Sequence, residues 1–351
     1  MSMQYKTFGR RSGLRVSQLA LGAGNFGTGW GHGADKAEAK AMFDTYIDAG
    51  GNFIDTADVY QGGQSEQFLG ELMAAERDNL VIATKYTLNG KHPGTTGNSR
   101  KNMMQAVDAS LKRMGTDRID LYWAHFADGL TPIEEILRGF DDLVRSGKIL
   151  YAGLSNFPAW RVARADLMAE LRGWSPLIGL QFEYSLAERT ADRELLPMTE
   201  ALGLGGTLWS PLAGGFLTGK YRAPTGESRL QNLGKLVHSE SSGRETAILD
   251  TVLAIAAEAD APPAHVAIAW LLARDAQSST ALVPLLGPRT KAQLDATLGA
   301  LKLTLSPAHI ARLDHVSAVD LGTPYRQIAD SADTIAGGQP SLRSPKLHPV
   351  A

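Results

Sequence analysis

The chain has 351 residues, a formal net charge of −2 and 44% hydrophobic residues, which allows one large α/β domain or two average ones. Its near-neutral charge offers no basic surface of the kind that nucleic-acid binders need, so we expect no nucleic-acid partner. The absence of cysteine excludes disulfides and Cys-ligated zinc, and suits a reducing cytoplasm, the compartment that we expect. We find no signal peptide and no apolar run of membrane-spanning length.

The chain order shows a hairpin followed by a regular alternation of strands and helices. Residues 4–16 predict an N-terminal β-hairpin with a glycine-containing turn. Eight apolar runs predict strands at 18–22, 52–55, 80–85, 119–125, 149–155, 177–182, 206–210 and 281–287. Helices are expected at 35–49, 65–75, 99–114 and 133–144, after Pro158, from near Arg244, at 291–301 and at 307–319.

These strands are unbroken apolar runs, which is typical of a parallel sheet that is covered on both faces. Eight strand–helix units predict a (β/α)8 TIM barrel, a fold that typically needs about 250 residues. We expect a single domain, 1–351, in which 4–318 form the barrel and its hairpin. The residues in excess of a typical barrel lie in the hairpin, in a Gly- and Pro-rich loop at 211–243, and in a C-terminal tail at 319–351. This tail is predicted to be either a covering segment or disordered.

A GxGxxG pattern runs from Gly22 to Gly27, directly after the first barrel strand. In a dinucleotide-binding fingerprint the third glycine opens a helix, so that the pyrophosphate meets the helix N-terminus. Here residues 28–34 intervene, and the acidic residues about 20 positions on, Asp44 and Asp48, fall within a helical pattern. We therefore interpret this stretch as a loop at the mouth of the barrel.

Three successive strands end in chemically useful residues: Asp55, Lys85 and His125. A single Asp at a strand end is usually a turn residue, but functional groups in such barrels come from the C-terminal ends of strands. Tyr60 follows one short loop after Asp55. A lysine within about 4–6 Å can lower the pKa of a tyrosine by roughly 1–3 units, and an aspartate keeps the lysine charged. With a histidine to orient a carbonyl oxygen, this set suits carbonyl reduction by hydride.

Asp55, Tyr60, Lys85 and His125 resemble the catalytic tetrad of the aldo-keto reductases, in a branch similar to bacterial enzymes and potassium channel β-subunits. The resemblance covers residues 4–318, and the runs at 51–60, 147–157 and 209–221 look like family signatures. It implies that Tyr60 is the general acid, that Lys85 and Asp55 tune it, and that His125 orients the substrate.

The same resemblance implies a nicotinamide cofactor, NADPH, with NADH left open. Trp209 would stack on the nicotinamide ring, and the polar residues Ser155, Asn156 and Gln181 would hold its carboxamide. The pyrophosphate would be wrapped by the 211–243 loop and its start, through Ser210, Pro211, Leu212, Gly214 and Lys220. The adenosine end would lie on Gly287, Arg289 and Gln293, with Arg289 on a 2′-phosphate. Gly24 and Asp55 complete the predicted cofactor-binding residues. The family often has Glu-Asn a few residues after the position of Gln293, where this chain has Ala296-Thr297, and this departure weakens the preference for NADPH.

Trp30, Tyr86 and Phe126 are expected on loops near the mouth, where they line the substrate pocket or simply pack. The other histidines lack metal-ligand spacing, so no metal is expected. We expect an oxidoreductase that reduces an aldehyde or ketone, or oxidises the alcohol in reverse. The alternative is a cofactor-binding regulatory or sensor subunit on the same barrel with little turnover. Substrate identity, direction and oligomeric state stay open.

Overall fold

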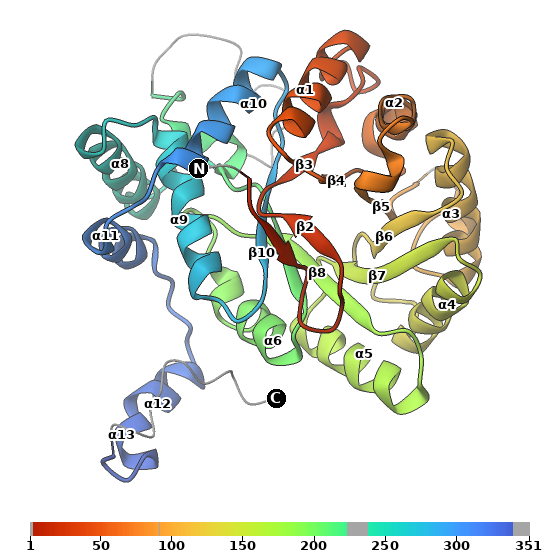
Figure 1. The fold of residues 1–351 in the computed structure, drawn as a ribbon. Helices are drawn as coiled ribbons and strands as arrows, with labels where there is room; N and C mark the ends of the chain where they lie inside the picture. The colour runs from red at the N-terminus through yellow and green to blue at the C-terminus, as the bar shows by residue number, and fades with distance from the viewer. Residues whose placement is uncertain (1–2, 91, 223–237, 340–351) are drawn as a thin grey trace.

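The computed structural model describes residues 3–90, 92–222 and 238–339 (Figure 1). Eight parallel strands close into a barrel in the order β10-β3-β4-β5-β6-β7-β8-β9. The predicted (β/α)8 barrel is thereby confirmed. The strands are β3 (Ala20–Gly22), β4 (Phe53–Asp55), β5 (Val81–Tyr86), β6 (Ile119–Ala124), β7 (Ile149–Ser155), β8 (Leu177–Glu183), β9 (Gly205–Trp209) and β10 (Leu282–Leu286).

Helices surround the barrel on its outer face (Figure 1). They are α1 (Lys36–Asp48), α2 (Gln64–Met73), α3 (Arg100–Met114), α4 (Ile133–Arg145), α5 (Ala159–Arg172), α6 (Leu195–Leu202), α8 (Gly243–Glu258), α9 (Pro263–Gln277), α10 (Lys291–Leu298) and α11 (Pro307–Ser317). The sequence predicted a helix from near Arg244, but neither α6 nor the separate α9, which begins at Pro263. A proline at the first helical position is favourable, because its missing N–H has no partner in the first turn anyway.

The N-terminal hairpin closes one end of the barrel. Its strands β1 (Tyr5–Thr7) and β2 (Arg15–Ser17) pair antiparallel, which confirms the predicted hairpin. Phe8, in the turn between them, is fully buried and meets the rings of Phe53 and Trp123 edge-on at 5.6 and 6.4 Å. A Cβ at Gly179 or Gly205 would lie 2.5 or 2.6 Å from the Phe8 ring. The barrel strands therefore need glycine at positions 179 and 205, where the Phe8 ring packs against them.

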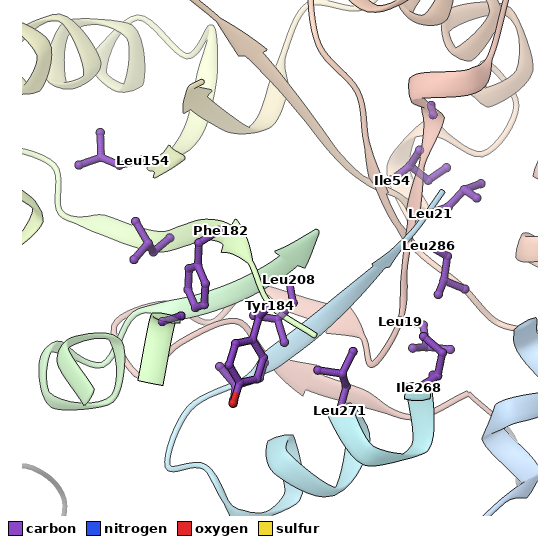
Figure 2. Packing of buried hydrophobic residues seen from close by; sticks show 14 of the residues in the cluster. Leu19, Leu21, Ile54, Leu154, Phe182, Tyr184, Leu208, Ile268, Leu271 and Leu286 are labelled. Carbon is purple, nitrogen blue, oxygen red and sulfur yellow. The ribbon is translucent and has the colours of Figure 1, made fainter. Parts of the chain in front are cut away.

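The larger hydrophobic core lies between the strands and the helices. Figure 2 shows side chains from neighbouring strands, such as Leu21, Ile54 and Leu286, on the same side as Ile268 and Leu271 of α9. Because successive residues of a strand point to opposite faces, each strand sends alternate residues into this core and into the barrel. This alternation decides which residues at the strand ends face the mouth.

The described part of the C-terminal tail contains two short helices, α12 (Tyr325–Asp330) and α13 (Ala332–Ile335), which lie off the barrel in Figure 1. Tyr325 Oη donates to Glu194 Oε1 at 3.0 Å, and Arg193 Nη2 donates to Thr323 O at 3.3 Å. The tail thus touches the chain just before α6. Residues 340–351, the rest of the predicted tail, lie outside the described residues.

Within the described ranges no single helix is long and apolar enough to cross a membrane. The pair α8 and α9 passes that test only when both are counted together, and the two are bent by 98°.

Candidate active site

The closed barrel brings the four predicted catalytic residues together at one rim. Asp55 is the last residue of β4, Lys85 lies one residue before the end of β5, and His125 directly follows β6. Tyr60 opens the short 3-10 turn η2 (Tyr60–Gly63) beyond β4. Since all eight strands are parallel, their carboxyl ends meet at the same edge, so residues far apart in the sequence share one site.

Lys85 is at the centre of the hydrogen-bond network. Its ammonium donates to the Asp55 carboxylate, to Thr56 O at 2.7 Å and to Tyr60 Oη at 3.3 Å. The side chains of Lys85 and Asp55 are 0% and 1% exposed. Burial lowers the pKa of Lys85, but the attraction of Asp55 and Tyr60 outweighs it and the net pKa is raised. The lysine therefore stays charged at neutral pH.

The Asp55 carboxylate is held from its other side by two neutral donors. Trp123 Nε1 and Gln181 Nε2 donate to Asp55 Oδ2 at 3.1 and 3.0 Å. A buried carboxylate needs such partners, because an uncompensated charge in a dry interior is costly. Sequence reasoning missed Trp123 as part of this site. Trp123 could have been found from its position two residues before His125, which places both residues on the same face of the strand.

Tyr60 lies between aromatic neighbours, with its ring edge-on to Trp30 at 6.0 Å and to His125 at 5.8 Å. Gly24 lies against the ring, since a Cβ there would be 3.5 Å from it. Burial raises the pKa of Tyr60, and the nearby Lys85 lowers it only in part. The expected net lowering is therefore wrong for this structure, because desolvation outweighs the lysine. Tyr60 holds its proton as a neutral phenol at neutral pH.

His125 is a neutral imidazole at the same rim. Burial, with the charge of Lys85, lowers its pKa well below the usual range. Its Nδ1 has no hydrogen-bond partner in the described part of the chain. The backbone N–H of His125 donates to Tyr86 O at 3.0 Å and to Thr87 Oγ1 at 3.2 Å, which fixes the residue at the strand end. A neutral, buried ring with an unused nitrogen is suited to hydrogen-bond an incoming polar atom.

A chain of hydrogen bonds links His125 to three more predicted residues along the rim. Asn156 Nδ2 donates to His125 O and to Ser155 Oγ, both at 3.0 Å. Trp209 Nε1 donates to Asn156 Oδ1 at 3.1 Å. Asn156 has φ 55°, a left-handed conformation that residues other than glycine adopt rarely. Trp209 is thus linked to His125 through one asparagine with a left-handed backbone.

The segment after Trp209 turns sharply. Ser210, Ala213, Gly214 and Gly215 have φ of 55°, 49°, 66° and 95°. The turn η6 (Ala213–Thr218) follows, with Pro211 and Leu212 packed at its start. Tyr221 Oη donates to Gly214 O at 2.8 Å, and Lys220 Nζ lies 5.0 Å from the centre of the Tyr221 ring. Part of the predicted cofactor-wrapping loop, 223–237, lies outside the described residues.

The residues predicted to bind adenosine lie together after β10. The side-chain amide of Asn25, which the sequence reasoning did not single out, donates to Gly287 O at 3.1 Å and to Pro288 O at 3.0 Å. Gln293 Oε1 accepts from the Arg289 N–H at 2.9 Å. The buried Arg289 Nη2 has no partner among the described atoms, and none of them lies within 4 Å of a Cβ built at Gly287. This end is open and carries an unused cationic donor.

The GxGxxG pattern is a loop, as expected. The turn η1 (Ala23–Asn25) follows β3, and α1 begins only at Lys36, well after Gly27. Asp35 caps α1 through a hydrogen bond from the Glu38 N–H at 2.9 Å, so the helix N-terminus is already occupied by a carboxylate.

Two of the three predicted substrate residues lie at the mouth and one does not. Trp30 is 46% and Phe126 40% exposed, and the Phe126 ring lies 5.1 Å from that of His125. Tyr86 is fully buried and stacks on Tyr122 at 5.4 Å. The placement of Tyr86 on a mouth loop is therefore wrong: it ends β5 and points outward to the helices, because its neighbour Lys85 points inward.

Asp58 is an acidic residue of this rim for which the sequence offered no role. Its Oδ1 is buried and has no partner among the described residues. Burial, followed by repulsion from Glu66, raises the pKa of Asp58 to about 7. Glu66 is itself fully buried and accepts from Thr84 Oγ1 and from Arg113 Nε, both at 2.6 Å. In the described ranges no three His, Asp or Glu side chains are grouped to hold a metal.

Known proteins resemble this chain over most of its length. Residues 18–318 match the Aldo/keto reductase family. An aryl-alcohol dehydrogenase of Pestalotiopsis microspora is 34% identical over 326 residues, covering 89% of this chain and 82% of that protein. A norsolorinic acid reductase of Aspergillus flavus is 35% identical over 327 residues, covering 89% and 81%. The aryl-alcohol dehydrogenase [NADP(+)] of Phanerodontia chrysosporium is 34% identical over 348 residues, covering 92% and 88%.

The family match covers most of the chain, and the similarity extends over 81% to 88% of these relatives' own lengths. The site described above lies within the matched residues, at the carboxyl ends of the barrel strands. The activity class follows from the match: an oxidoreductase that acts on carbonyl compounds. The chain belongs to the aldo/keto reductase family.

Proposed function

We propose that the protein is an NADPH-dependent reductase of aldehydes or ketones in which Tyr60 donates the proton. The observation that carries this proposal is the Lys85 ammonium, which hydrogen-bonds Asp55 and Tyr60 at the same time in a buried site. A phenol beside a fixed cation is a proton donor whose conjugate base is stabilised in place. The same groups serve alcohol oxidation in reverse.

The proton moves between two oxygens. As the carbonyl carbon accepts a hydride, negative charge develops on the carbonyl oxygen, and the Tyr60 hydroxyl transfers its proton there to give the alcohol. The resulting phenolate lies 3.3 Å from the Lys85 ammonium, which compensates its charge in a site of low dielectric. Asp55 keeps Lys85 charged and fixed. The phenolate then regains a proton from solvent.

His125 orients the substrate in this proposal. Because its pKa is lowered, the ring is neutral at physiological pH and does not compete with Tyr60 as an acid. A neutral imidazole N–H can still donate a hydrogen bond to the carbonyl oxygen and hold it toward the phenol. Its edge-on contact with the Tyr60 ring, at 5.8 Å between centres, keeps the two groups on the same side of the site.

The rim residues fit a nicotinamide dinucleotide. Trp209 and Asn156 would hold the nicotinamide end. Gly214 and Gly215 have left-handed backbones and no side chains, so a pyrophosphate could approach their backbone N–H groups closely. The unpartnered Nη2 of Arg289 suits a 2′-phosphate, which favours NADPH. A relative named aryl-alcohol dehydrogenase [NADP(+)] agrees with this choice. When bound, the reduced nicotinamide supplies the hydride.

The mouth favours aromatic substrates. Trp30 and Phe126 expose large rings beside Tyr60 and His125, and aromatic walls bind planar rings through stacking and edge contacts. Two of the relatives described above are named aryl-alcohol dehydrogenases. We therefore propose aryl aldehydes as the substrate class.

The test is cofactor consumption. NADPH and NADH oxidation should be followed at 340 nm against aryl aldehydes, aliphatic aldehydes and ketones. The proposal predicts turnover with NADPH and an aryl aldehyde at a kcat of about 1–10³ s⁻¹, the ordinary range of enzymes. Tight cofactor binding without turnover of any substrate, in either direction, would favour the regulatory subunit instead.

A further inference from the structure

Gln61, the residue after Tyr60, has an unusual backbone. Its φ and ψ are 52° and 33°, in the left-handed region, and its side chain is buried, with the residue 1% exposed. Two glycines, Gly62 and Gly63, follow it with φ of 67° and 97°. A glycine at position 61 would adopt this conformation without strain, so the strained glutamine points to a use of its side chain.

The side-chain amide of Gln61 forms hydrogen bonds with two residues of the loop 22–34 at the mouth of the barrel (the mouth loop), and both residues contact the Tyr60 ring. Its Oε1 accepts from the Trp30 N–H at 3.0 Å, and its Nε2 donates to Gly24 O at 3.2 Å. Gly24 lies against the Tyr60 ring, and Trp30 meets that ring edge-on. One buried side chain therefore sets the position of the backbone beneath the phenol and of the aromatic wall beside it.

The mouth loop is built around this residue. A Cβ at Gly29 would lie 2.3 Å from Gln61 O, and one at Gly27 would lie 2.8 Å from Gln61 Cβ. The loop has glycine where it passes closest to Gln61, so it approaches that residue more closely than any other residue type would allow. The glycines of the mouth loop thus have a steric role here.

We propose that Gln61 is a positioning residue that fixes Trp30 beside Tyr60 and thereby sets the preference for planar aromatic carbonyls. This inference rests on the proposed carbonyl reductase function. Gln61 acts through Trp30 and Gly24, so it governs substrate binding more than the proton transfer itself. Loss of its side chain should release Trp30 but leave Lys85, Asp55, Trp209 and Arg289 in place.

The test is Gln61→Gly, which removes both hydrogen bonds and relaxes the backbone, so the variant should fold. The KM for benzaldehyde should rise about tenfold, a change of the size expected when one aromatic contact is lost. The kcat, the Kd of NADPH and the KM for a short aliphatic aldehyde should change less than twofold. The fluorescence of Trp30 alone is obtained by subtracting the spectrum of Gln61→Gly/Trp30→Phe from that of Gln61→Gly, and the spectrum of Trp30→Phe from that of the parent. Acrylamide should quench the Trp30 fluorescence more strongly in Gln61→Gly than in the parent.

Gln64→Ala is the matched control, because Gln64 Oε1 accepts from Thr28 N in the same loop at 2.9 Å but does not hold Trp30. It should leave the KM for benzaldehyde unchanged. An unchanged KM for benzaldehyde in Gln61→Gly, or an equal rise for both aldehydes, would overturn the role of Gln61. So would unchanged quenching of Trp30. Absence of turnover in the unaltered protein would instead reject the proposed function, on which this inference depends.

Discussion

The Lys85 ammonium lies against the Asp55 carboxylate, and both side chains are almost completely shielded from solvent. The pair joins the ends of two adjacent barrel strands, β4 and β5. Each charge depends on the other, since neither has water to solvate it. Lys85 also donates a hydrogen bond to Tyr60, so the same ammonium contacts both the carboxylate and the phenol.

Removing one partner of this pair should cost more stability than removing both charges. In Lys85→Met the Asp55 carboxylate keeps only neutral donors, and the free energy of unfolding should fall by about 3–5 kcal/mol. Asp55→Asn combined with Lys85→Met leaves no buried charge and should recover part of that loss. Urea unfolding at pH 7.5 measures both. A double variant less stable than Lys85→Met would contradict the account.

Asp58 should make stability depend on pH. Its folded-state pKa is about 7 against an ordinary 3.8, so the folded state favours the protonated form. The sign follows: stability attributable to Asp58 is fully present below about pH 4 and declines as the pH rises through 7. Asp58→Asn should therefore stabilise the protein at pH 8. We expect a gain on the order of 2 kcal/mol, which is less than the full pKa shift would give, because solvent partly screens a side chain that is not fully buried.

The comparison is between thermal or urea unfolding of Asp58→Asn and the parent at pH 5 and pH 8. The gain should be larger at pH 8, where the parent carboxylate is ionised. A gain that is equal at the two pH values, or a loss at pH 8, would mean that the Asp58 carboxylate is stabilised in the folded state after all.

Arg289 should distinguish the two cofactors. Arg289→Gln removes the guanidinium whose Nη2 has no partner among the described residues. The Kd of NADPH should rise at least tenfold while that of NADH changes little, because charge-assisted bonds to phosphate are strong. Lys291→Ala is the control, since it removes a nearby cation that is already paired with Asp295. Fluorescence titration measures each Kd. Equal losses for NADPH and NADH would contradict a contact with the 2′-phosphate.

Much of this fold and site could be predicted from the sequence. Eight apolar runs specify a closed parallel barrel, and parallel strands bring their carboxyl ends to one edge, so Asp55, Lys85 and His125 were expected together. Local pattern alone located the strand ends within a residue or two. The helices α6 and α9 were not predicted: α6 has only 8 residues, and α9 follows α8 after a short turn.

The direction of a side chain and the balance of its electrostatics were harder to predict. Tyr86 was placed at the mouth because it follows Lys85, but a shift of one residue along a strand reverses the face. The pKa of Tyr60 was expected to fall, but desolvation by the surrounding fold exceeds the attraction of Lys85. Gln61 has no signal in the sequence, since its role depends on a left-handed backbone that only the structure reveals.

The most direct test of the central claim is Tyr60→Phe, which removes the hydroxyl but keeps the ring against Trp30 and His125. Loss of a general acid lowers kcat by about 10²–10⁴-fold. We predict a loss of that size for aryl aldehyde reduction, with the Kd of NADPH unchanged in fluorescence titration. A Tyr60→Phe protein that retains more than about a tenth of the parental kcat would show that the proton comes from another group.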